Sequence, residues 1–473
     1  MLLERKDGAG KKKKGRIVIG YDLDDTHAQI SYYFLHRDVQ RADDASGGED
    51  SRKDALQKEA VPKDSSRRGT PDGDVETLAV VAGTEQYNIP AVLCRKKEVK
   101  QWLFGREAVK FAEEGECFLI KNLVSLARAG EWVEAGEERF DPVALLTLFI
   151  KRSLSLLTLI ASPDYLEGVM FTIDRLDGRM VEILSQVGAN LQLKTDQVYF
   201  QSHVESYYYY MLHQPKELWM QEVLLCDYDN KRLKIYGFGV NNRTTPKVAL
   251  IDINEYEGME RGEPAAENTG MEGLEKSRLD RTFLEIVQNR CSASPVSCVY
   301  LIGDGYKDGW ASESLRYLCR GRRVFQGNNL YSKGACYGIR EKLGIEPIGE
   351  EYVFLGLDKL KANIGMRVLR RGEESYFALM DAGVNWFETK KEFHVILEDG
   401  DALSLLLTPL DGQEPKQVDM ILEGIEKRPR WTTRLEIKTE MLSERELSVR
   451  VKDLGFGSFF PASGGEWNKV FEI

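Results

Sequence analysis

Two strand-turn-strand units with acidic turns, far apart in the chain, constrain its fold most. Residues 17–20 are apolar and lead into the acidic turn 22–26, and residues 223–226 lead into a second acidic turn at 227–231. A second apolar segment follows each turn, and in the first unit apolar and polar residues alternate there with a period of two. This alternation is typical of a β-strand, so each acidic turn is predicted to close a β-hairpin. Mixed helical and strand segments follow both hairpins, which predicts a duplicated α/β architecture rather than one doubly wound sheet.

Length and charge exclude several classes of protein. A chain of 473 residues is too long for one compact core and predicts several domains. Its formal net charge of −11 leaves no excess of basic side chains to neutralise phosphates, which argues against a nucleic-acid partner. The most apolar stretch, 143–161, has Lys151 and Arg152 at its centre, and residues 1–16 lack the apolar core of a secretory signal. The seven cysteines form no CxxC pair and are typical of reduced thiols. We therefore expect a cytoplasmic protein without a membrane span.

Changes in composition divide the chain further. Residues 1–15 form a basic tail, and residues 37–76 have few apolar side chains and no period, which predicts a disordered insertion. Residues 99–113 have the spacing of an amphipathic helix, and the polar residues 255–277 are expected to form an exposed loop. From about residue 352 onward short alternating segments predict a separate β-rich domain. In one of them Leu435, Ile437 and Thr439 are expected on one face of a strand, and Glu436, Lys438 and Glu440 on the other.

The first acidic turn holds the densest group of carboxylates. Asp22, Asp24 and Asp25 repel one another unless they are solvated or bound to a divalent cation, so both a solvated turn and a metal site remain open. The run 22–26 resembles the first motif of haloacid dehalogenase-like phosphatases, in which Asp22 would be the nucleophile and Asp24 the acid/base. Residues 303–308 resemble that family's last, Mg²⁺-binding motif. Thr172 and Lys276 would then supply its hydroxyl and its lysine.

A second resemblance covers much more of the chain. The segments that carry it are 20–28, 89–92 with 104–110, 170–173, 203–206, 225–233, 300–305, 327–336, 354–358 and 422–430. In this order they resemble the first phosphate loop, the stretch with the catalytic lysine, and the strand and connection that end the first lobe. The later segments resemble the second phosphate loop, the adenosine motif, the second connection, the apolar linker and the β-sandwich. That is the order found in DnaK-type heat-shock chaperones, members of the actin-like ATPase superfamily.

The resemblance implies a fold and a site. The fold would be an actin-like ATPase fold of two lobes, built from duplicated ribonuclease-H-like units and followed by a C-terminal β-sandwich. Lobe I would span 16–205, lobe II with a reduced clamp subdomain 206–350, the linker 351–360 and the sandwich 361–473. Lys110 would be the catalytic lysine and Glu205 the acid that orients water, while Asp22 and Asp227 would hold Mg²⁺. The residues expected around ATP or ADP are Asp22, Asp24, Asp25, Thr26, Asp227, Lys231, Gly303, Asp304 and Gly305.

Departures from the family's pattern decide the predicted function. Phosphate loops need glycine because backbone N–H groups must approach phosphate oxygens closely. Here Asp24 and Asp25 replace the glycines of the first loop, and Asp304 replaces one in the adenosine motif. At an effective dielectric constant near 20, an unpaired carboxylate about 4 Å from a phosphate charge costs roughly 4 kcal/mol. The sequence therefore predicts weak or absent ATP hydrolysis.

We expect a pseudo-ATPase or nucleotide-sensing module that binds a protein or an extended peptide through its sandwich, with no nucleic-acid or membrane partner. The alternatives are an active ATP-dependent chaperone and the phosphatase centred on Asp22 and Asp24.

Overall fold

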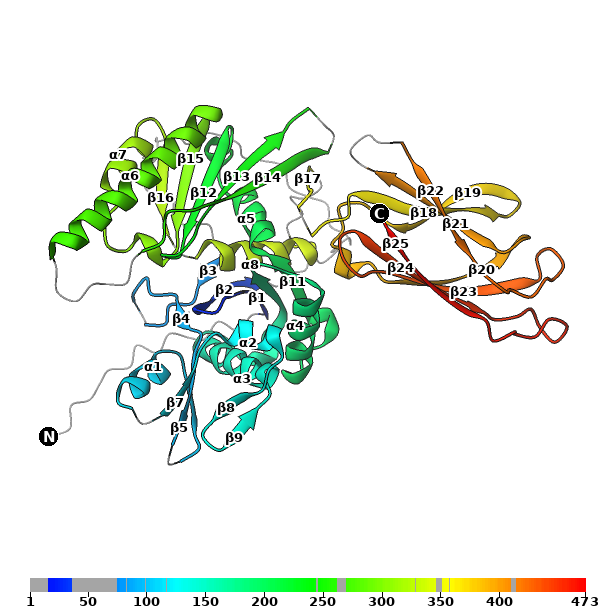
Figure 1. Cartoon of the computed structure of the whole chain (residues 1–473), viewed down its shortest axis with the longest axis horizontal. Coiled ribbons are helices and arrows are strands. Elements are labelled where there is room, and N and C mark those ends of the chain that lie inside the picture. Colours follow the sequence, from blue (N-terminus) through cyan, green and yellow to red (C-terminus); the bar gives the residue numbers. More distant parts are fainter. Residues whose placement is uncertain are drawn as a thin grey trace, which may run out of the picture.

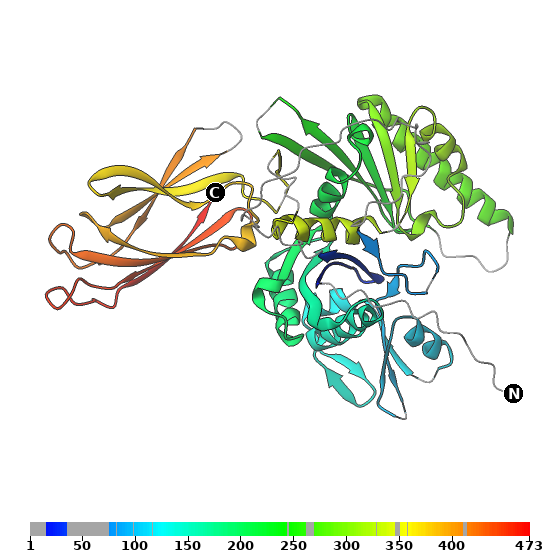
Figure 2. The same cartoon turned by 180° about the vertical axis from the view of Figure 1, so that it is seen from behind.

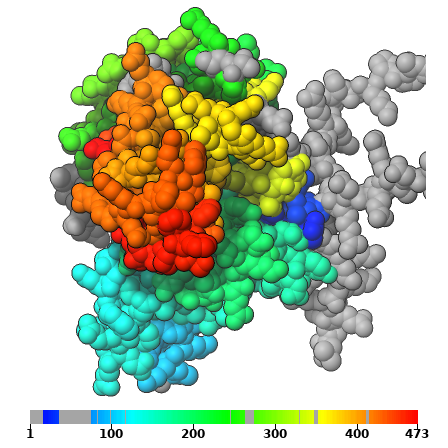
Figure 3. Space-filling view, turned by 90° about the vertical axis from the view of Figure 1, so that its right-hand side faces the viewer, coloured from blue at the N-terminus to red at the C-terminus, as the bar shows by residue number. Residues whose placement is uncertain are grey.

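The computed structural model contains two lobes and a β-sandwich, which Figure 1 and Figure 2 show from opposite sides. The sandwich lies beside both lobes, and in Figure 3 it faces the viewer with lobe II above and lobe I below. The residues described are 16–35, 75–81, 83–97, 99–115, 117–243, 246–261, 269–327, 329–345, 351–356, 358–409 and 414–473. The predicted basic tail and residues 37–74 of the predicted insertion lie outside them.

Lobe I is built on a mixed sheet with the strand order β11-β10-β1-β2-β3, in which β4 also pairs with β2. β1 pairs antiparallel with β2 and parallel with β10, and β10 pairs parallel with β11. Smaller sheets, β6-β5-β7 and β8-β9, extend the lobe. Its strands are β1 (Arg16–Leu23), β2 (His27–Leu35), β3 (Glu76–Thr77), β4 (Ile89–Pro90), β5 (Leu93–Lys96), β6 (Trp102–Phe104), β7 (Cys117–Ile120), β8 (Val133–Ala135), β9 (Glu138–Phe140), β10 (Leu166–Ile173) and β11 (Val198–Ser202). Its helices are α1 (Gly105–Glu113), α2 (Leu123–Ala129), α3 (Pro142–Leu154), the 3₁₀ turns η1 (Ser155–Leu159), η2 (Pro163–Tyr165) and η3 (Thr195–Gln197), and α4 (Gly178–Asn190).

Lobe II repeats the arrangement. Its sheet has the order β16-β15-β12-β13-β14, with β17 added beyond β14. β12 pairs antiparallel with β13 and parallel with β15, and β15 pairs parallel with β16, so strand order and directions match those of lobe I. The elements are β12 (Glu222–Tyr228), β13 (Leu233–Asn241), β14 (Lys247–Tyr256), α6 (Thr269–Ala293), β15 (Val296–Ile302), η5 (Asp304–Tyr306), α7 (Ser312–Leu318), β16 (Arg323–Gln326) and β17 (Tyr352–Phe354).

Two helices lie between the sheets: α5 (His203–Leu212), which leads through η4 (Lys216–Leu218) into lobe II, and α8 (Leu330–Lys342). One apolar core joins them to Val18 of lobe I and Val223 of lobe II. A Cβ atom on Gly20 of β1 would lie 2.2 Å from the backbone oxygen of Ser332 in α8. The glycine is therefore needed for the close approach of α8 to β1. The two lobes therefore form five layers. Helices α2 to α4 cover the sheet of lobe I, α5 and α8 lie between the two sheets, and α6 and α7 cover the sheet of lobe II.

The C-terminal domain is a sandwich of two antiparallel sheets, β19-β18-β21-β22 and β20-β23-β24-β25, which share one apolar core. Its elements are β18 (Ala362–Arg370), β19 (Glu373–Met380), η6 (Trp386–Glu388), β20 (Lys391–Leu397), β21 (Ala402–Pro409), β22 (Lys416–Ile421), β23 (Thr433–Met441), β24 (Glu446–Asp453) and β25 (Glu466–Glu472). In β23 the residues Leu435, Ile437 and Thr439 are buried and their neighbours are not, which confirms the predicted alternation.

Several local predictions are corrected. Residues 102–104 form β6, so the helix predicted over 99–113 begins only at Gly105. The loop predicted over 255–277 contains the end of β14 and the start of α6, and Glu76, placed in the insertion, belongs to β3. α5 spans the boundary expected at residue 205. Cys94 and Cys117 form a disulfide between β5 and β7, so the expectation of reduced thiols is wrong for this pair.

By length and composition, one stretch among the described residues could cross a membrane, Pro142–Leu159. It comprises α3 and η1, and half of it is buried inside the protein. Leu146, Phe149 and Ile150 of this stretch belong to the core of lobe I.

Candidate functional site

The two acidic turns are built in the same way. Between β1 and β2, Oδ1 of Asp24 accepts hydrogen bonds from the backbone N–H groups of Thr26 and His27, at 2.6 and 2.7 Å. Between β12 and β13, Oδ1 of Asp229 accepts hydrogen bonds from the backbone N–H groups of Lys231 and Arg232, at 2.9 and 2.7 Å. Aspartates at this position of a turn fix the backbone conformation. Asp24 and Asp229 therefore shape equivalent turns of the two lobes.

The first carboxylate of each turn contacts an aromatic ring. Oδ1 of Asp22 lies 2.8 Å from Nε2 of His203, and the Tyr331 hydroxyl donates to Oδ2 of Asp227 over 2.8 Å. The His203 and Tyr331 rings are stacked, with centroids 3.9 Å apart and planes 9° from parallel. These four residues, which we call the central bridge, connect the ends of β1 and β12 through the first turns of α5 and α8.

Buried charge surrounds the central bridge. Burial alone would lower the pKa of His203, but the hydrogen-bonded Asp22 carboxylate, with Asp174 and Asp227, raises it above its ordinary value. Burial raises the pKa of Asp227 to about 6, against the opposing effects of Tyr331 and His203. The negative charge that gathers where the lobes meet therefore favours the protonated form of His203.

A second cation joins the lobes beside the bridge. Nζ of Lys234, on β13, donates to both carboxylate oxygens of Asp174 at the end of β10, over 2.9 and 2.7 Å. Burial would raise the pKa of Asp174, but His203 and Lys234 lower it below its ordinary value. The carboxylates at the centre of the molecule thus already have cationic or hydroxyl partners.

Asp22 and Asp227, the residues predicted to hold Mg²⁺, have side-chain partners of their own. Each of these carboxylates is bonded to one ring of the stacked pair. Among the described residues, no group of three or more His, Cys, Asp or Glu side chains is placed to hold a metal ion. One carboxylate oxygen of Asp22 and one of Asp227 are therefore bonded to a ring of the central bridge.

The predicted adenosine loop packs closely against Tyr228. A Cβ atom on Gly303, whose φ is +96°, would lie 2.2 Å from the backbone oxygen of Tyr228, and one on Gly305 would lie 2.2 Å from the Tyr228 ring. That ring packs edge-on against Trp310, with centroids 5.6 Å apart. Asp304 forms an ion pair with Lys307, the shortest N···O distance being 2.9 Å. Gly303 and Gly305 therefore allow the close approach of Tyr228 to this loop.

Other predicted site residues have structural partners or are dispersed. Asp25 accepts hydrogen bonds from the backbone N–H and the hydroxyl of Ser125 in the first turn of α2. The Thr26 hydroxyl donates to Asp24 within the turn. Lys110 is exposed near the end of α1, and Lys231 is exposed on its turn. The structure does not gather these residues around one cavity.

Glu205 has a role that the sequence did not indicate. Its Oε1 atom lies 2.7 Å from Nζ of Lys359, which directly precedes the sandwich, and both side chains are buried. This ion pair anchors the linker to α5. The water-orienting role of Glu205 stays a prediction.

The phosphatase set is not assembled either. The Thr172 hydroxyl is buried and shares a 2.6 Å hydrogen bond with Ser206. Lys276 lies on α6 of lobe II, and Asp308 forms an ion pair with Arg261 of the same lobe. Asp22, the proposed nucleophile, lies on β1 of lobe I and is bonded to His203.

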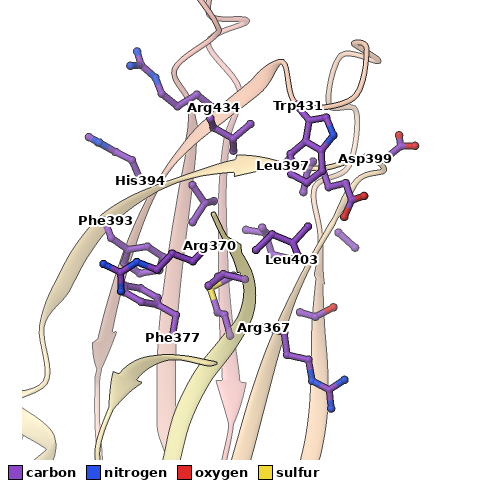
Figure 4. Close-up of a pocket in the computed structure, with 18 of the residues that line it drawn as sticks. Arg367, Arg370, Phe377, Phe393, His394, Leu397, Asp399, Leu403, Trp431 and Arg434 are labelled. Carbon is purple, nitrogen blue, oxygen red and sulfur yellow. The ribbon is translucent and has the colours of Figure 1, made fainter. Parts of the chain in front are cut away.

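The sandwich contains an open groove of about 870 Å³ at the end where β18 finishes and β23 begins. Figure 4 shows its apolar centre, to which Leu397, Leu403 and Trp431 contribute from one side and Phe377 and Phe393 from the other. Phe377 and Phe393 pack edge-on with centroids 5.1 Å apart. A half-exposed apolar surface of this size is typical of a site for another molecule.

Trp431 is the most unusual residue of the groove. It is 44% exposed, and its φ of +66° is in the left-handed region, which bulky side chains rarely adopt. Its backbone N–H donates to the carbonyl oxygen of Glu398, which holds the ring at the mouth. Strained conformations of this kind gather at binding sites.

The sequence missed His203, Tyr331 and the groove. His203 directly follows a strand, as the acidic turns do, and this position was the only local signal. The groove residues alternate with a period of two, as in any strand. This period does not reveal where two neighbouring strands of a sheet separate.

Comparison with known protein families divides the chain at the same place as the structure. Residues 74–357 match a family described as "Family of unknown function (DUF5716) C-terminal", and because this is more than half of the chain, the protein belongs to that family. Residues 359–473 match "Domain of unknown function (DUF8552)", so this second match covers the sandwich. A search of curated proteins found no match.

Proposed function

We propose that this protein binds an extended segment of a protein or peptide in the sandwich groove, and that its lobes form a scaffold that does not turn over nucleotide. The proposal takes the lobes as actin-like and the whole chain as a relative of the DnaK-type chaperones. It is supported by the shared strand order of the lobes, their equivalent acidic turns and the two helices packed between them.

The groove is the observation that carries the proposal. It exposes apolar side chains from both sheets at one end of the sandwich, and a strained tryptophan stands at its mouth. At the predicted nucleotide site, in contrast, Asp22 and Asp227 are bonded within the central bridge, and Gly303 and Gly305 face Tyr228. Binding at the groove is therefore the activity that these surfaces support best.

A substitution of Trp431 tests the groove. Asparagine adopts a positive φ more readily than tryptophan, so Trp431→Asn keeps the backbone and removes the aromatic surface. We expect the affinity for an extended apolar peptide to fall at least about tenfold, as for an aromatic hot spot. Fluorescence anisotropy with a labelled peptide measures the affinity, and thermal unfolding should show no loss of stability.

The matched control is Trp132→Asn, which changes a tryptophan that is 59% exposed in lobe I. It should leave peptide affinity unchanged. If both variants bind as the parent chain does, or if the parent chain binds no peptide, the groove is not the binding site.

A further inference from the structure

We infer that the partner enters the groove as an added β-strand between β18 and β21, and that acidic residues flank its apolar core. This inference rests on the proposed function and specifies the chemistry of the partner. It follows from two independent features of the groove, an opening in one sheet and an excess of unpaired arginines.

The first feature is an interrupted ladder. β18 and β21 pair from Ala362↔Pro409 to Gly365↔Leu406, and within the described residues their pairing stops there. Residues 366–370 of β18 continue to pair with β19, and residues 402–405 of β21 continue to pair with β22. The two inner strands therefore separate, and each keeps one backbone edge without a strand partner. Such edges accept an additional strand.

The opening is matched to an extended peptide. At about 3.3 Å per residue, residues 366–370 offer an edge of about 17 Å. Beneath it lie Phe393, Val395 and Leu397, alternate residues of β20 in the opposite sheet, all half-buried. Alternate side chains of an inserted strand would point down onto this apolar floor, and the others would point to solvent.

The second feature is charge. Arg367, Arg370 and Arg434 line the groove, and all three are exposed. Figure 4 shows the side chains of Arg367 and Arg434 directed away from the apolar centre. Within the described part of the chain none of them forms an ion pair, whereas Glu398 and Asp399 at the mouth both contact Arg430.

Unpaired guanidinium groups around an apolar floor favour carboxylates on either side of an apolar core. The groove lining also contains three carboxylates, but Glu398 and Asp399 already contact Arg430, so the three arginines face only one further lining carboxylate, Glu374. A partner with acidic flanks is therefore the occupant that fits the groove.

The test compares two labelled peptides of about nine residues with the same alternating valine and threonine core. One has glutamates at both ends and the other has lysines. We expect the full-length protein to bind the acidic peptide about tenfold more tightly, with a preference that shrinks as salt is added. The triple variant Arg367→Glu, Arg370→Glu, Arg434→Glu should invert the preference.

The control Arg445→Glu makes the same type of charge change at an exposed arginine of the sandwich that does not line the groove. It should keep the preference for the acidic peptide. Equal affinity for both peptides in the parent and the triple variant would overturn the charge assignment, while a loss of binding in Trp431→Asn would still support the groove.

Backbone N-methylation tests the added strand. Methylating alternate amides removes the N–H groups that face one edge, so each of the two methylation patterns should weaken binding about tenfold or more. Unchanged affinity for both patterns would overturn strand addition. A concentration-dependent dimer that the peptide dissociates, detected by sedimentation, would identify a second copy of the chain as the occupant and contradict the inference.

Discussion

Replacing Lys359 with methionine is expected to destabilise the folded protein by about 3–5 kcal/mol. The substitution leaves Glu205 without its cation, and the side chains of Lys359 and Glu205 are only 8% and 2% exposed. The Oε2 atom of Glu205 is buried and has no hydrogen-bond partner, so little else compensates its charge. Urea unfolding followed by tryptophan fluorescence measures the loss.

Two further variants show whether the lost charge pair is the cause. The double variant Lys359→Met, Glu205→Leu removes both charges and should regain most of the stability, because apolar replacements of a buried pair are often neutral. Lys342→Met breaks a pair with Glu388 of the same 2.7 Å length but with side chains 24% and 31% exposed, and should cost about 1 kcal/mol or less. A double variant as unstable as Lys359→Met would contradict the ion-pair explanation.

Replacing Gly334 with alanine is expected to destabilise the protein by about 3 kcal/mol, the upper part of the range for inserting a group into a packed core. A Cβ atom there would lie 1.9 Å from the backbone oxygen of Ser206, where α8 crosses α5. Because the backbone of Ser206 cannot rotate away as a side chain could, α5 and α8 must move apart. This disturbs the packing of both sheets against these two helices. The same unfolding experiment measures the effect.

Gly273→Ala is the matched control for this substitution. Gly273 lies in α6, where an added Cβ would meet no atom within 4 Å. Alanine is favoured over glycine inside a helix, so this variant should be more stable by up to about 1 kcal/mol. If Gly334→Ala were tolerated as well, the helices would not be in contact and the layer order would be wrong.

The local sequence pattern predicted those strands and turns whose structure depends on residues close by in the chain. The hairpins around both acidic turns and the alternation of β23 follow from a period of two, which needs no knowledge of distant contacts. The helix expected over 99–113 failed at its start, because Trp102 and Leu103 pair with β5 and this tertiary contact overrides the helical spacing.

The candidate site depended on distant residues, and there the predictions were incomplete. Asp22 was singled out from its acidic turn, but its partner His203 is 181 positions away and only the packing of α5 brings them together. Glu205 was assigned from the resemblance, and its ion pair with Lys359, 154 positions away, has no local signal. Cys94 and Cys117 likewise meet through the pairing of β5 with β7.

The most direct test of the central claim is the affinity of the full-length protein for the acidic peptide, with and without saturating ATP and Mg²⁺. Because Asp22 and Asp227 are bonded within the central bridge and Asp24 and Asp25 stand in place of the phosphate-loop glycines, we expect saturable binding whose dissociation constant changes by less than about twofold. A change of about fivefold or more, within the range of genuine allosteric coupling, would show that the lobes bind nucleotide and control the groove. That result would contradict the account.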